Sequence, residues 1–389
     1  MAAATQILDF LHGQRDQLVE FLEQLARTES PSTSGAAQQP AFALLAAALD
    51  ELSFEPHILP GRASGGQLYA RPRKRFRTPS IQLLLGHIDT VWPKGTLENM
   101  PVQREGDRLR GPGVYDMKGG LTQIVFALRA LRELGLAAPV TPVVFVNSDE
   151  EIGSRESTRH IRRLARIASR AYVLEPSLGP EGRLKTARKG IGRFTLTVKG
   201  RAAHAGLNPE AGASAILELS HQIQRLFALN DPGSGVTVNV GMIDGGIGPN
   251  VVAPESRAVI DVRVPTHEAA RRVEEAIHRL APVTPGVSLK IEGAIGRPPM
   301  ERTPAGQELW GVAHTLGQEL GLNLEQASAG GGSDGNTTSQ YTATLDGLGP
   351  VGDGAHAHHE FVVVDKLIER TALLTLLLLA PVATPIKLT

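Results

Sequence analysis

Residues 81–90 read IQLLLGHIDT, an apolar run that ends in a histidine and an aspartate. A short, continuously apolar run is typical of a central strand in a sheet that is covered on both faces. Side chains two residues apart on a strand point the same way, so His87 and Asp89 are expected to face one spot. A histidine oriented by a carboxylate is common at metal sites and at acid–base sites, and this strand end alone is compatible with either.

The chain on either side of this strand continues as alternating strands and helices. We predict further strands at 141–147 (TPVVFVN) and 171–174 (AYVL), and a helix with an apolar stripe over 118–135. Strand–helix–strand order favours an α/β fold with a mostly parallel sheet. Apolar residues at helical spacing also predict helices at 5–28 and 40–53. Further helices are expected at 307–321 and, as a buried C-terminal helix, at the apolar segment 372–382.

The pattern changes near residue 190. The segment 191–198 (IGRFTLTV) alternates apolar and polar residues, as in a strand with one solvated face. A helix, two strands, a helix and a strand follow, at about 211–229, 236–243, 257–264, 267–281 and 287–292. The resulting order βαββαβ is that of a ferredoxin-like α+β domain.

These patterns predict a small domain inserted into a larger one. The length of 389 residues is sufficient for two or three domains. The larger α/β domain is expected to take in 1–187 and 299–389, and the insertion 188–298. The Pro-rich segment 297–306 is expected to be a linker.

The composition excludes several kinds of site and partner. Lys+Arg and Asp+Glu both number 40, so the formal net charge is zero and nothing favours a nucleic-acid partner. The chain has no cysteine, so any metal must be bound by histidine and carboxylate side chains. The N-terminus lacks the pattern of a secretory signal, and 372–382 is too short for a bilayer, which takes about 20 residues. We expect a soluble, cytoplasmic protein without a membrane partner.

Acids and a histidine follow the predicted α/β strands. His87 and Asp89 end the first strand, SDEE (148–151) follows the second, and Glu175 follows the third. In parallel α/β sheets, functional groups collect beyond the carboxyl ends of the strands.

Two further segments carry candidate ligands. Asp116 lies just before the long helix, and GAHAHHEF (354–361) follows a glycine-rich stretch. Each segment alone has an ordinary structural explanation, such as a helix cap or a solvated loop. If all these segments meet at one edge of the sheet, their carboxylates repel one another. Bound divalent cations would remove this repulsion.

The order of these motifs resembles that of a known enzyme family. GHIDTV, GPGVYDMKGG, NSDEEIGS, EPS, GRAAHAG and GAHAHHEF are similar to segments of the acetylornithine deacetylase / succinyl-diaminopimelate desuccinylase / glutamate carboxypeptidase family of di-zinc peptidases. The resemblance covers nearly the whole chain and is strongest to the glutamate carboxypeptidase branch. It implies a co-catalytic di-zinc metallopeptidase with an inserted lid domain through which two copies dimerise.

The resemblance also assigns metal ligands. It implies that His87 and Glu151 hold one zinc ion, that Glu175 and His356 hold the other, and that Asp116 bridges the two ions. Cobalt or manganese would bind similar groups. The same histidine-rich motif contains His358 and His359, which are alternatives to His356.

Two neighbouring residues would act on these ligands and on water. Asp89 is expected to hydrogen-bond the second ring nitrogen of His87. The pair at 87 and 89 would then be a metal ligand and the carboxylate that orients it. Glu150, beside the ligand Glu151, is the candidate general base.

Residues in or near the inserted domain would bind the substrate. The resemblance implies that His204 reaches the partner's active site in a homodimer and helps to stabilise the oxyanion. Arginine matches planar carboxylates, which suits Arg263 and Arg297 to a C-terminal carboxylate, although either could be an ordinary solvated residue. The remaining candidates are Asn250, Arg188, Lys189, and Gly331 in the glycine-rich run 330–336 that would line the pocket.

The implied function is hydrolysis of an amide or peptide bond that releases a C-terminal amino acid, with glutamate as first choice. The alternatives are an N-acyl-amino-acid deacylase or a dipeptidase, with a small peptide or N-acyl amino acid as substrate. In a different class, the same fold could serve as a metal-free binding protein or pseudoenzyme.

Overall fold

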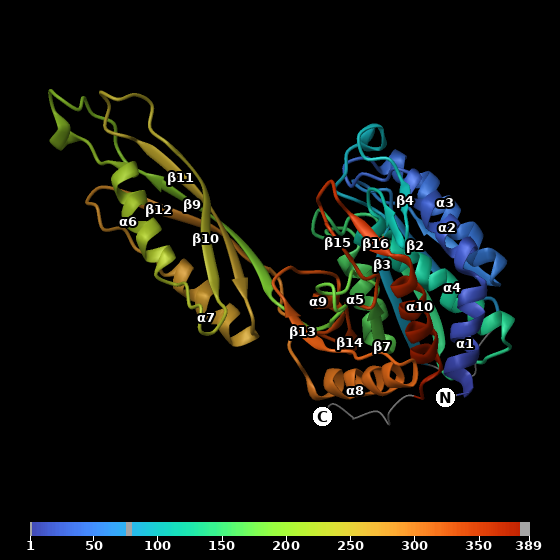
Figure 1. The fold of residues 1–389 in the computed structure, drawn as a ribbon. Coiled ribbons are helices and arrows are strands. Elements are labelled where there is room, and N and C mark those ends of the chain that lie inside the picture. Colours follow the sequence, from blue (N-terminus) through green and yellow to red (C-terminus); the bar gives the residue numbers. More distant parts are fainter. Residues whose placement is uncertain (1, 75–79, 382–389) are drawn as a thin grey trace. The chain divides into compact units, whose positions relative to one another are not determined.

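The computed structural model describes residues 2–74 and 80–381. The chain divides into two compact units, coloured along the sequence in Figure 1. Apart from the residues not described, unit 1 comprises Met1–Thr186, Arg302–Ser328 and Ser333–Thr389. Unit 2 comprises Ala187–Glu301 and the short segment Ala329–Gly332. Unit 2 is therefore inserted into the sequence of unit 1.

The main sheet of unit 1 has six strands in the order β1-β2-β6-β3-β7-β14. Strand β3 is parallel to its neighbours β6 and β7, and β14 is parallel to β7. Strands β1 and β2 form an antiparallel hairpin that joins the edge of this parallel part at β6. The bounds are β1 Phe54–Leu59, β2 Gln67–Pro72, β3 Ile81–His87, β6 Thr141–Asn147, β7 Ala168–Val173 and β14 Ala343–Leu345. The predicted α/β class is confirmed, although the hairpin was not predicted.

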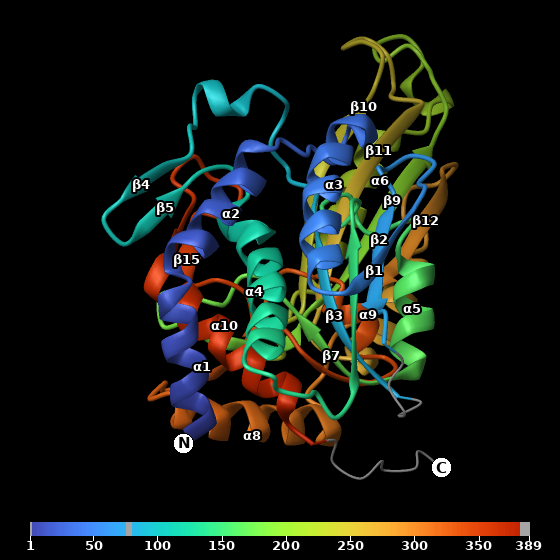
Figure 2. The ribbon, with the colours of Figure 1, turned by 90° about the vertical axis from the view of Figure 1, so that its right-hand side faces the viewer.

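The continuous apolar run of β3 is explained by helices on both faces of the sheet. Leu83 and Leu85 pack in a cluster with Ile161 of helix α5 (Thr158–Ile167). Leu84 belongs to the core formed with the helices α1 (Ala2–Gly13), α2 (Arg15–Arg27), α3 (Gly35–Glu51), α4 (Gly119–Glu133) and α10 (Val364–Leu379). In Figure 2, α5 and α4 lie on opposite sides of β3. Residues that face either side of the sheet are therefore buried in β3. The strand does not show the alternation of apolar and polar residues that is typical of a strand with one solvated face.

The helices of unit 1 agree broadly with the predicted ranges. The segment 5–28 forms two helices that are interrupted at Gln14, and the apolar C-terminal segment is the second half of a longer helix. Residue 382, the last of that predicted segment, lies outside the described residues. The helices are α1 Ala2–Gly13, α2 Arg15–Arg27, α3 Gly35–Glu51, α4 Gly119–Glu133, α5 Thr158–Ile167, α8 Pro304–Glu319, α9 Gly335–Thr338 and α10 Val364–Leu379.

Glycines at the start of α4 bring this helix against the sheet. A Cβ atom on Gly120 would lie 2.0 Å from the carbonyl oxygen of Leu174. Only glycine permits that approach. The close contact places the turn Val114–Lys118, which precedes α4, next to the end of β7.

Short strands also build structure that the sequence did not reveal. A second sheet of unit 1 has the order β15-β16-β5-β4, with β4 Gln103–Glu105, β5 Arg108–Arg110, β15 Gly352–Asp353 and β16 Phe361–Val363. Strand β8 (Leu184–Arg188) pairs with β13 (Gln326–Ala329). Strands of two to five residues are too short for a periodic pattern to emerge.

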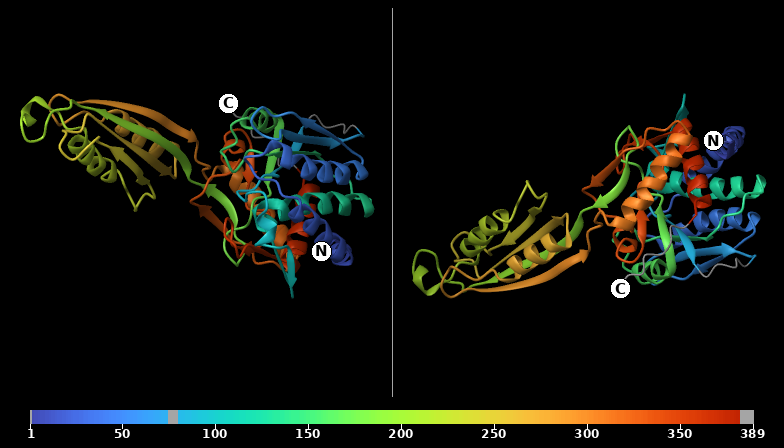
Figure 3. Two further views of the ribbon diagram at one scale, coloured as in Figure 1. Left: turned by 90° about the horizontal axis from the view of Figure 1, so that it is seen from above. Right: turned by 90° about the horizontal axis from the view of Figure 1, so that it is seen from below.

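Unit 2 has the predicted βαββαβ order. Its antiparallel sheet runs β10-β11-β9-β12, and α6 and α7 cover one face of it, as the two views of Figure 3 show. Both helices begin after a hydroxyl cap, because Ser214 Oγ accepts from Leu217 N and Thr266 Oγ1 accepts from Ala269 N. The bounds are β9 Gly190–Lys199, α6 Ala215–Phe227, β10 Thr237–Gly245, β11 Glu255–Val264, α7 His267–His278 and β12 Ser288–Arg297.

The predicted linker 297–306 is shorter in the structure. Strand β12 continues to Arg297, and α8 begins at Pro304 after the cap Thr303. Proline is well tolerated in the first turn of a helix, so the Pro-rich composition did not exclude a helix start here. Within residues 2–74 and 80–381, no helix combines the length and apolar character needed to cross a membrane.

Candidate metal centre

Histidines and carboxylates from five segments of unit 1 meet at one edge of the main sheet. His87 ends β3, Glu175 follows β7, and Glu150 and Glu151 lie in the loop after β6. Asp116 lies in the turn before α4, and His356 in the loop between β15 and β16. Parallel strands end at the same edge, which explains the convergence of the first three segments.

Asp116 lies between two imidazoles. His87 Nε2 is 3.2 Å from Asp116 Oδ1, and His356 Nε2 is 3.6 Å from Asp116 Oδ2. Each imidazole also contacts a glutamate: His87 Nε2 is 3.5 Å from Glu175 Oε1, and His356 Nε2 is 3.2 Å from Glu151 Oε2.

These contacts differ from the ligand pairs expected from the sequence. The glutamate in contact with His87 is Glu175 and the one in contact with His356 is Glu151, whereas His87 with Glu151 and Glu175 with His356 were expected. A looser grouping of ligand atoms within 4.8 Å does include His87, Asp116 and Glu151. Strand β3 lies between β6 and β7, so motif order alone could not decide which following acid meets His87.

The polar groups of this cluster have strongly perturbed acidities. Burial raises the pKa of the Glu151 carboxyl to about 7, although contact with His356 partly counteracts the shift. Asp116 and Glu151 together raise the pKa of His356 to about 10. The cluster of carboxylates therefore favours positive charge near it.

The donor set fits divalent cations. Within the described part of the chain, His87 Nε2, Asp116 Oδ1 and Glu151 Oε1 are buried without a hydrogen-bond partner. Buried polar atoms are normally satisfied, so atoms of this kind that face one another are candidate ligands. His87, Glu150 and Glu175 form a second group of ligand atoms within 4.8 Å. Nitrogen and oxygen donors of this kind suit zinc and its neighbours.

Asp89 has a wider role than the expected bond to His87. Its Oδ1 is 3.4 Å from His87 Nδ1, but the shorter contact of that nitrogen, 2.9 Å, is with the backbone oxygen of Asp89. The carboxylate accepts from the backbone N–H groups of Glu150 and Glu151, both at 3.2 Å, and from Ser32 Oγ at 2.8 Å. Asp89 thus orients the histidine and fixes both glutamates.

Glu360 is a residue of the site that the sequence analysis did not identify. Its buried carboxylate accepts from the backbone N–H groups of Gly113, Tyr115 and Asp116 at 2.9–3.0 Å, and from Trp92 Nε1 at 2.9 Å. It therefore shapes the turn that presents Asp116. A glutamate directly after the histidine-rich run was the available signal.

The three histidines of the C-terminal motif have different surroundings. Only the contacts of His356 reach the cluster, at Asp116 and Glu151, in the described structure. The ring of His358 lies 5.3 Å from the ring of Trp92, and His359 is exposed. The geometry favours His356 over the two alternatives.

In unit 2, His204 and Asn250 lie together in neighbouring loops. Ala205 N donates to Asn250 O at 2.9 Å, and His204 pairs with Val251 in an isolated bridge. His204 is exposed, and its Nδ1 accepts from the backbone N–H groups of Gly206 and Leu207.

The arginine candidates lie at the opposite end of β9. Arg263 and Arg297 both pair with Ile191, from strands on either side of it. Residues directly opposite in a sheet share one face, so the two side chains emerge from the same face. Arg263 is engaged with Asp261 at 2.7 and 3.1 Å.

Arg188 and Gly331 belong to the same end of unit 2. Arg188 Nη1 donates to Gly331 O at 3.1 Å, and Lys189 N donates to Ala329 O at 2.9 Å. A Cβ on Gly332 would lie 3.0 Å from Arg297 Cδ, which places Arg297 beside this glycine-rich segment.

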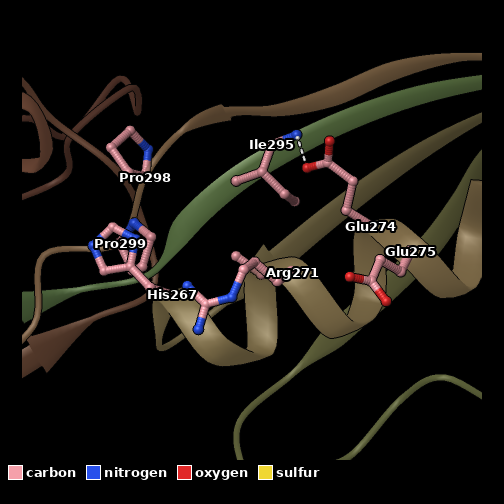
Figure 4. Close-up of a pocket in the computed structure, with 8 residues that line it drawn as sticks. His267, Arg271, Glu274, Glu275, Ile295, Pro298 and Pro299 are labelled. Atoms are coloured by element: carbon pink, nitrogen blue, oxygen red, sulfur yellow. Dashed lines mark hydrogen bonds between the residues drawn. The ribbon is translucent and has the colours of Figure 1, made fainter.

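An open depression of about 380 Å³ in unit 2 does not contain the predicted site residues. It lies between α7 and the end of β12 (Figure 4). Glu274, in its wall, accepts from the backbone N–H of Ile295 at 3.1 Å, so this carboxylate serves the fold. His267 and Arg271 line the same depression.

An α/β sheet that gathers imidazoles and carboxylates at its strand ends has the donor groups of a metal-dependent enzyme. The chain belongs to the peptidase family M20/M25/M40, whose model matches residues 83–380. The resemblance found in the motifs is thereby confirmed, and the protein is a metallopeptidase or amidohydrolase.

Individual relatives agree with this assignment. Carboxypeptidase G2 of Pseudomonas sp. (strain RS-16) is 30% identical over 295 residues, 74% of this chain and 71% of the relative. Succinyl-diaminopimelate desuccinylase of Delftia acidovorans is 27% identical over 315 residues, 76% of this chain and 80% of the relative. The crystal structure of aminopeptidase PepT from Bacillus cereus superposes with a TM-score of 0.77 at 21% identity, covering 94% of this chain and 98% of that one.

Proposed function

We propose that this chain is a di-zinc amidohydrolase that cleaves an amide bond and releases a C-terminal amino acid, with glutamate as the first candidate. The observation that carries the proposal is Asp116, which lies between two imidazole–glutamate pairs. The relative named carboxypeptidase G2 supports the choice of a carboxypeptidase.

The proposed ligand sets are based on the contacts between these side chains. His87 and Glu175 would hold one ion, His356 and Glu151 the other, and Asp116 would contribute one oxygen to each. Two such ions, when bound, polarise the carbonyl group of the substrate and make the attacking water more acidic.

Glu150 is the proposed proton carrier. It neighbours the ligand Glu151, and its carboxylate lies within 4.8 Å of ligand atoms of His87 and Glu175. It would take a proton from the attacking water and deliver it to the nitrogen of the departing amine. Asp89 holds its backbone N–H and so limits where the carboxylate can lie.

The C-terminal carboxylate of the substrate would be bound by unit 2. Arg263 and Arg297 emerge from one face of its sheet, and Arg297 lies beside Gly332. Planar guanidinium groups match carboxylates in a bidentate manner. A second candidate function, removal of an acyl group from an amino acid, is favoured by the desuccinylase relative of Delftia acidovorans.

The proposal predicts metal-dependent hydrolysis with a preference for a free C-terminal carboxylate. We expect the chelated, metal-free protein to be inactive and to regain turnover with zinc, cobalt or manganese. The measurement is amine release from a matched panel of N-acyl amino acids and dipeptides, each with its C-terminal amide as control. Equal rates for acids and amides would contradict carboxylate recognition. A metal-free protein that binds the panel without turnover would favour the binding-protein alternative.

We also propose that the chain forms a homodimer through unit 2. Strand β10 is an edge of its sheet, and Met242 and Ile243 on it are 68% and 66% exposed. Ile216 and Leu217 at the start of α6 are half exposed, and a Cβ on Gly246 would lie 3.1 Å from Ile216, which joins the two apolar areas. An exposed apolar edge strand is suited to pairing with another copy.

A mixing experiment tests whether His204 acts across this dimer. His204→Ala and Glu150→Ala proteins should each be nearly inactive, since loss of an oxyanion donor typically costs about 10²–10³-fold in turnover. Mixed dimers should recover activity, because one of their sites has Glu150 from one chain and His204 from the other. The measurement is turnover after subunit exchange. Met242→Glu, which places a charge on the apolar edge, should abolish recovery, and no recovery in demonstrated mixed dimers would refute the role of His204.

A further inference from the structure

Glu150 and Glu151 of the metal centre lie in a turn that is closed by backbone hydrogen bonds. Gly153 N donates to Glu150 O at 2.8 Å, and Ser154 N donates to Asp149 O at 2.7 Å. Ser154 is buried and has a φ of 52°, in the left-handed region that residues other than glycine seldom adopt. A conformation of this kind persists only where surrounding contacts hold it.

The side chain of Ser154 contacts Asp334, which lies far away in the sequence. Ser154 Oγ donates to Asp334 Oδ1, and Asn147 Nδ2 at the end of β6 donates to Asp334 Oδ2 at 2.7 Å. Asn147 Nδ2 also donates to Ser157 Oγ at 2.8 Å. All of these side chains are buried, and Asp334 is 3% exposed.

Asp334 and Asp89 hold opposite ends of the same turn. Asp89 accepts from the N–H groups of Glu150 and Glu151 where the turn begins, and Asp334 accepts from Ser154 where it ends. Hydrogen bonds to a carboxylate are stronger than neutral ones and are costly to leave unmade in a buried place. The glycine-rich run 330–336, expected to line a pocket, thus supplies a contact to the loop of the catalytic carboxylates.

We propose that Asp334 is a positioning residue for Glu150 and Glu151, acting through Ser154. Without the Asp334 carboxylate, Ser154 can leave the left-handed conformation, and the turn can open between Gly153 and Glu150. The carboxylate of Glu150 would then occupy several positions. A displacement of about 1 Å at a reacting group can cost on the order of 10²-fold in rate. The catalytic part of this inference rests on the proposed role of Glu150.

The test compares Asp334→Ala, Asp334→Asn and Ser154→Ala with a matched control. At saturating zinc, Asp334→Ala and Ser154→Ala should lower kcat by about 10–10²-fold with KM changed less than about twofold. Asp334→Asn should restore most of kcat, because its amide can donate to Ser154 and its oxygen can accept from Asn147. The control Thr344→Val removes a buried hydroxyl that donates to Thr338 Oγ1 at 3.0 Å, and it should lower stability without changing kcat.

Amide hydrogen exchange provides a readout independent of turnover. Asp334→Ala should speed exchange at Glu150 to Ser154, and Thr344→Val should leave these amides unchanged. Unchanged exchange in this turn, or a kcat reduction no larger than that of Thr344→Val, would overturn the proposal. If the wild-type protein hydrolyses none of the panel, the proposed function fails, and exchange at these amides then decides alone whether Asp334 holds the turn.

Discussion

Replacing Glu150 with glutamine is expected to lower kcat by about 10²–10⁴-fold while the metal content of the protein stays near that of the wild type. The substitution keeps the size of the side chain and removes its ability to accept a proton. The backbone N–H of residue 150 still reaches Asp89, so the turn should keep its shape. The measurements are kcat at saturating zinc and metal per chain by elemental analysis.

The neighbouring substitution Glu151→Gln is the matched control for this experiment. Glu151 contacts His356 at 3.2 Å and is a proposed ligand, so its loss should first reduce metal content and only thereby activity. Excess zinc should restore part of the activity of Glu151→Gln and none of that of Glu150→Gln. Loss of both ions from the Glu150 variant would refute its role as a base, and full metal occupancy in the Glu151 variant would show that the roles of the two adjacent acids are exchanged.

Replacing Asp116 with alanine is expected to abolish both metal binding and turnover. Asp116 is the one proposed ligand shared by both ions, because its two oxygens face His87 and His356. Its removal also leaves two imidazole–glutamate pairs without the carboxylate between them. Metal titration by calorimetry should show no site of wild-type affinity, and turnover should fall to the level of the metal-free protein.

Substitutions of single histidines are expected to have smaller effects on metal binding than Asp116→Ala. His356→Ala should weaken one ion and leave the set of His87, Glu175 and Asp116 in place, whereas His358→Ala should retain both ions. A wild-type metal content in Asp116→Ala would refute a bridging role. An inactive His358 variant beside an active His356 variant would show that the wrong histidine was chosen.

Short-range patterns account for the parts of the fold that were predictable. The continuous apolar run at 81–85 and the alternation at 191–198 each reflect how many faces of a strand are buried, and burial leaves its mark on adjacent residues. Those patterns yield the α/β sheet and the βαββαβ insertion. The short strands β4, β5, β15 and β16 were not predicted, because two or three residues are too few to show a periodic pattern of apolar residues.

The candidate ligands were predictable as a set, because functional groups gather where parallel strands end and because the motifs resemble those of known peptidases. The contacts between individual ligands could not be predicted from the sequence. His87 contacts Glu175, which follows β7, although β6 and β7 both lie beside β3, and His356 contacts Glu151 because the loop between β15 and β16 brings it there.

The residues that hold the site in shape could be identified only from the tertiary structure. Asp89 binds the amides of Glu150 and Glu151, Glu360 binds those around Asp116, and Asp334 binds Ser154. Each of these bonds joins segments separated by tens to hundreds of residues, and no local period or spacing encodes such a distance. A buried carboxylate must find donors wherever the fold brings them, so only the folded chain decides which amides it holds.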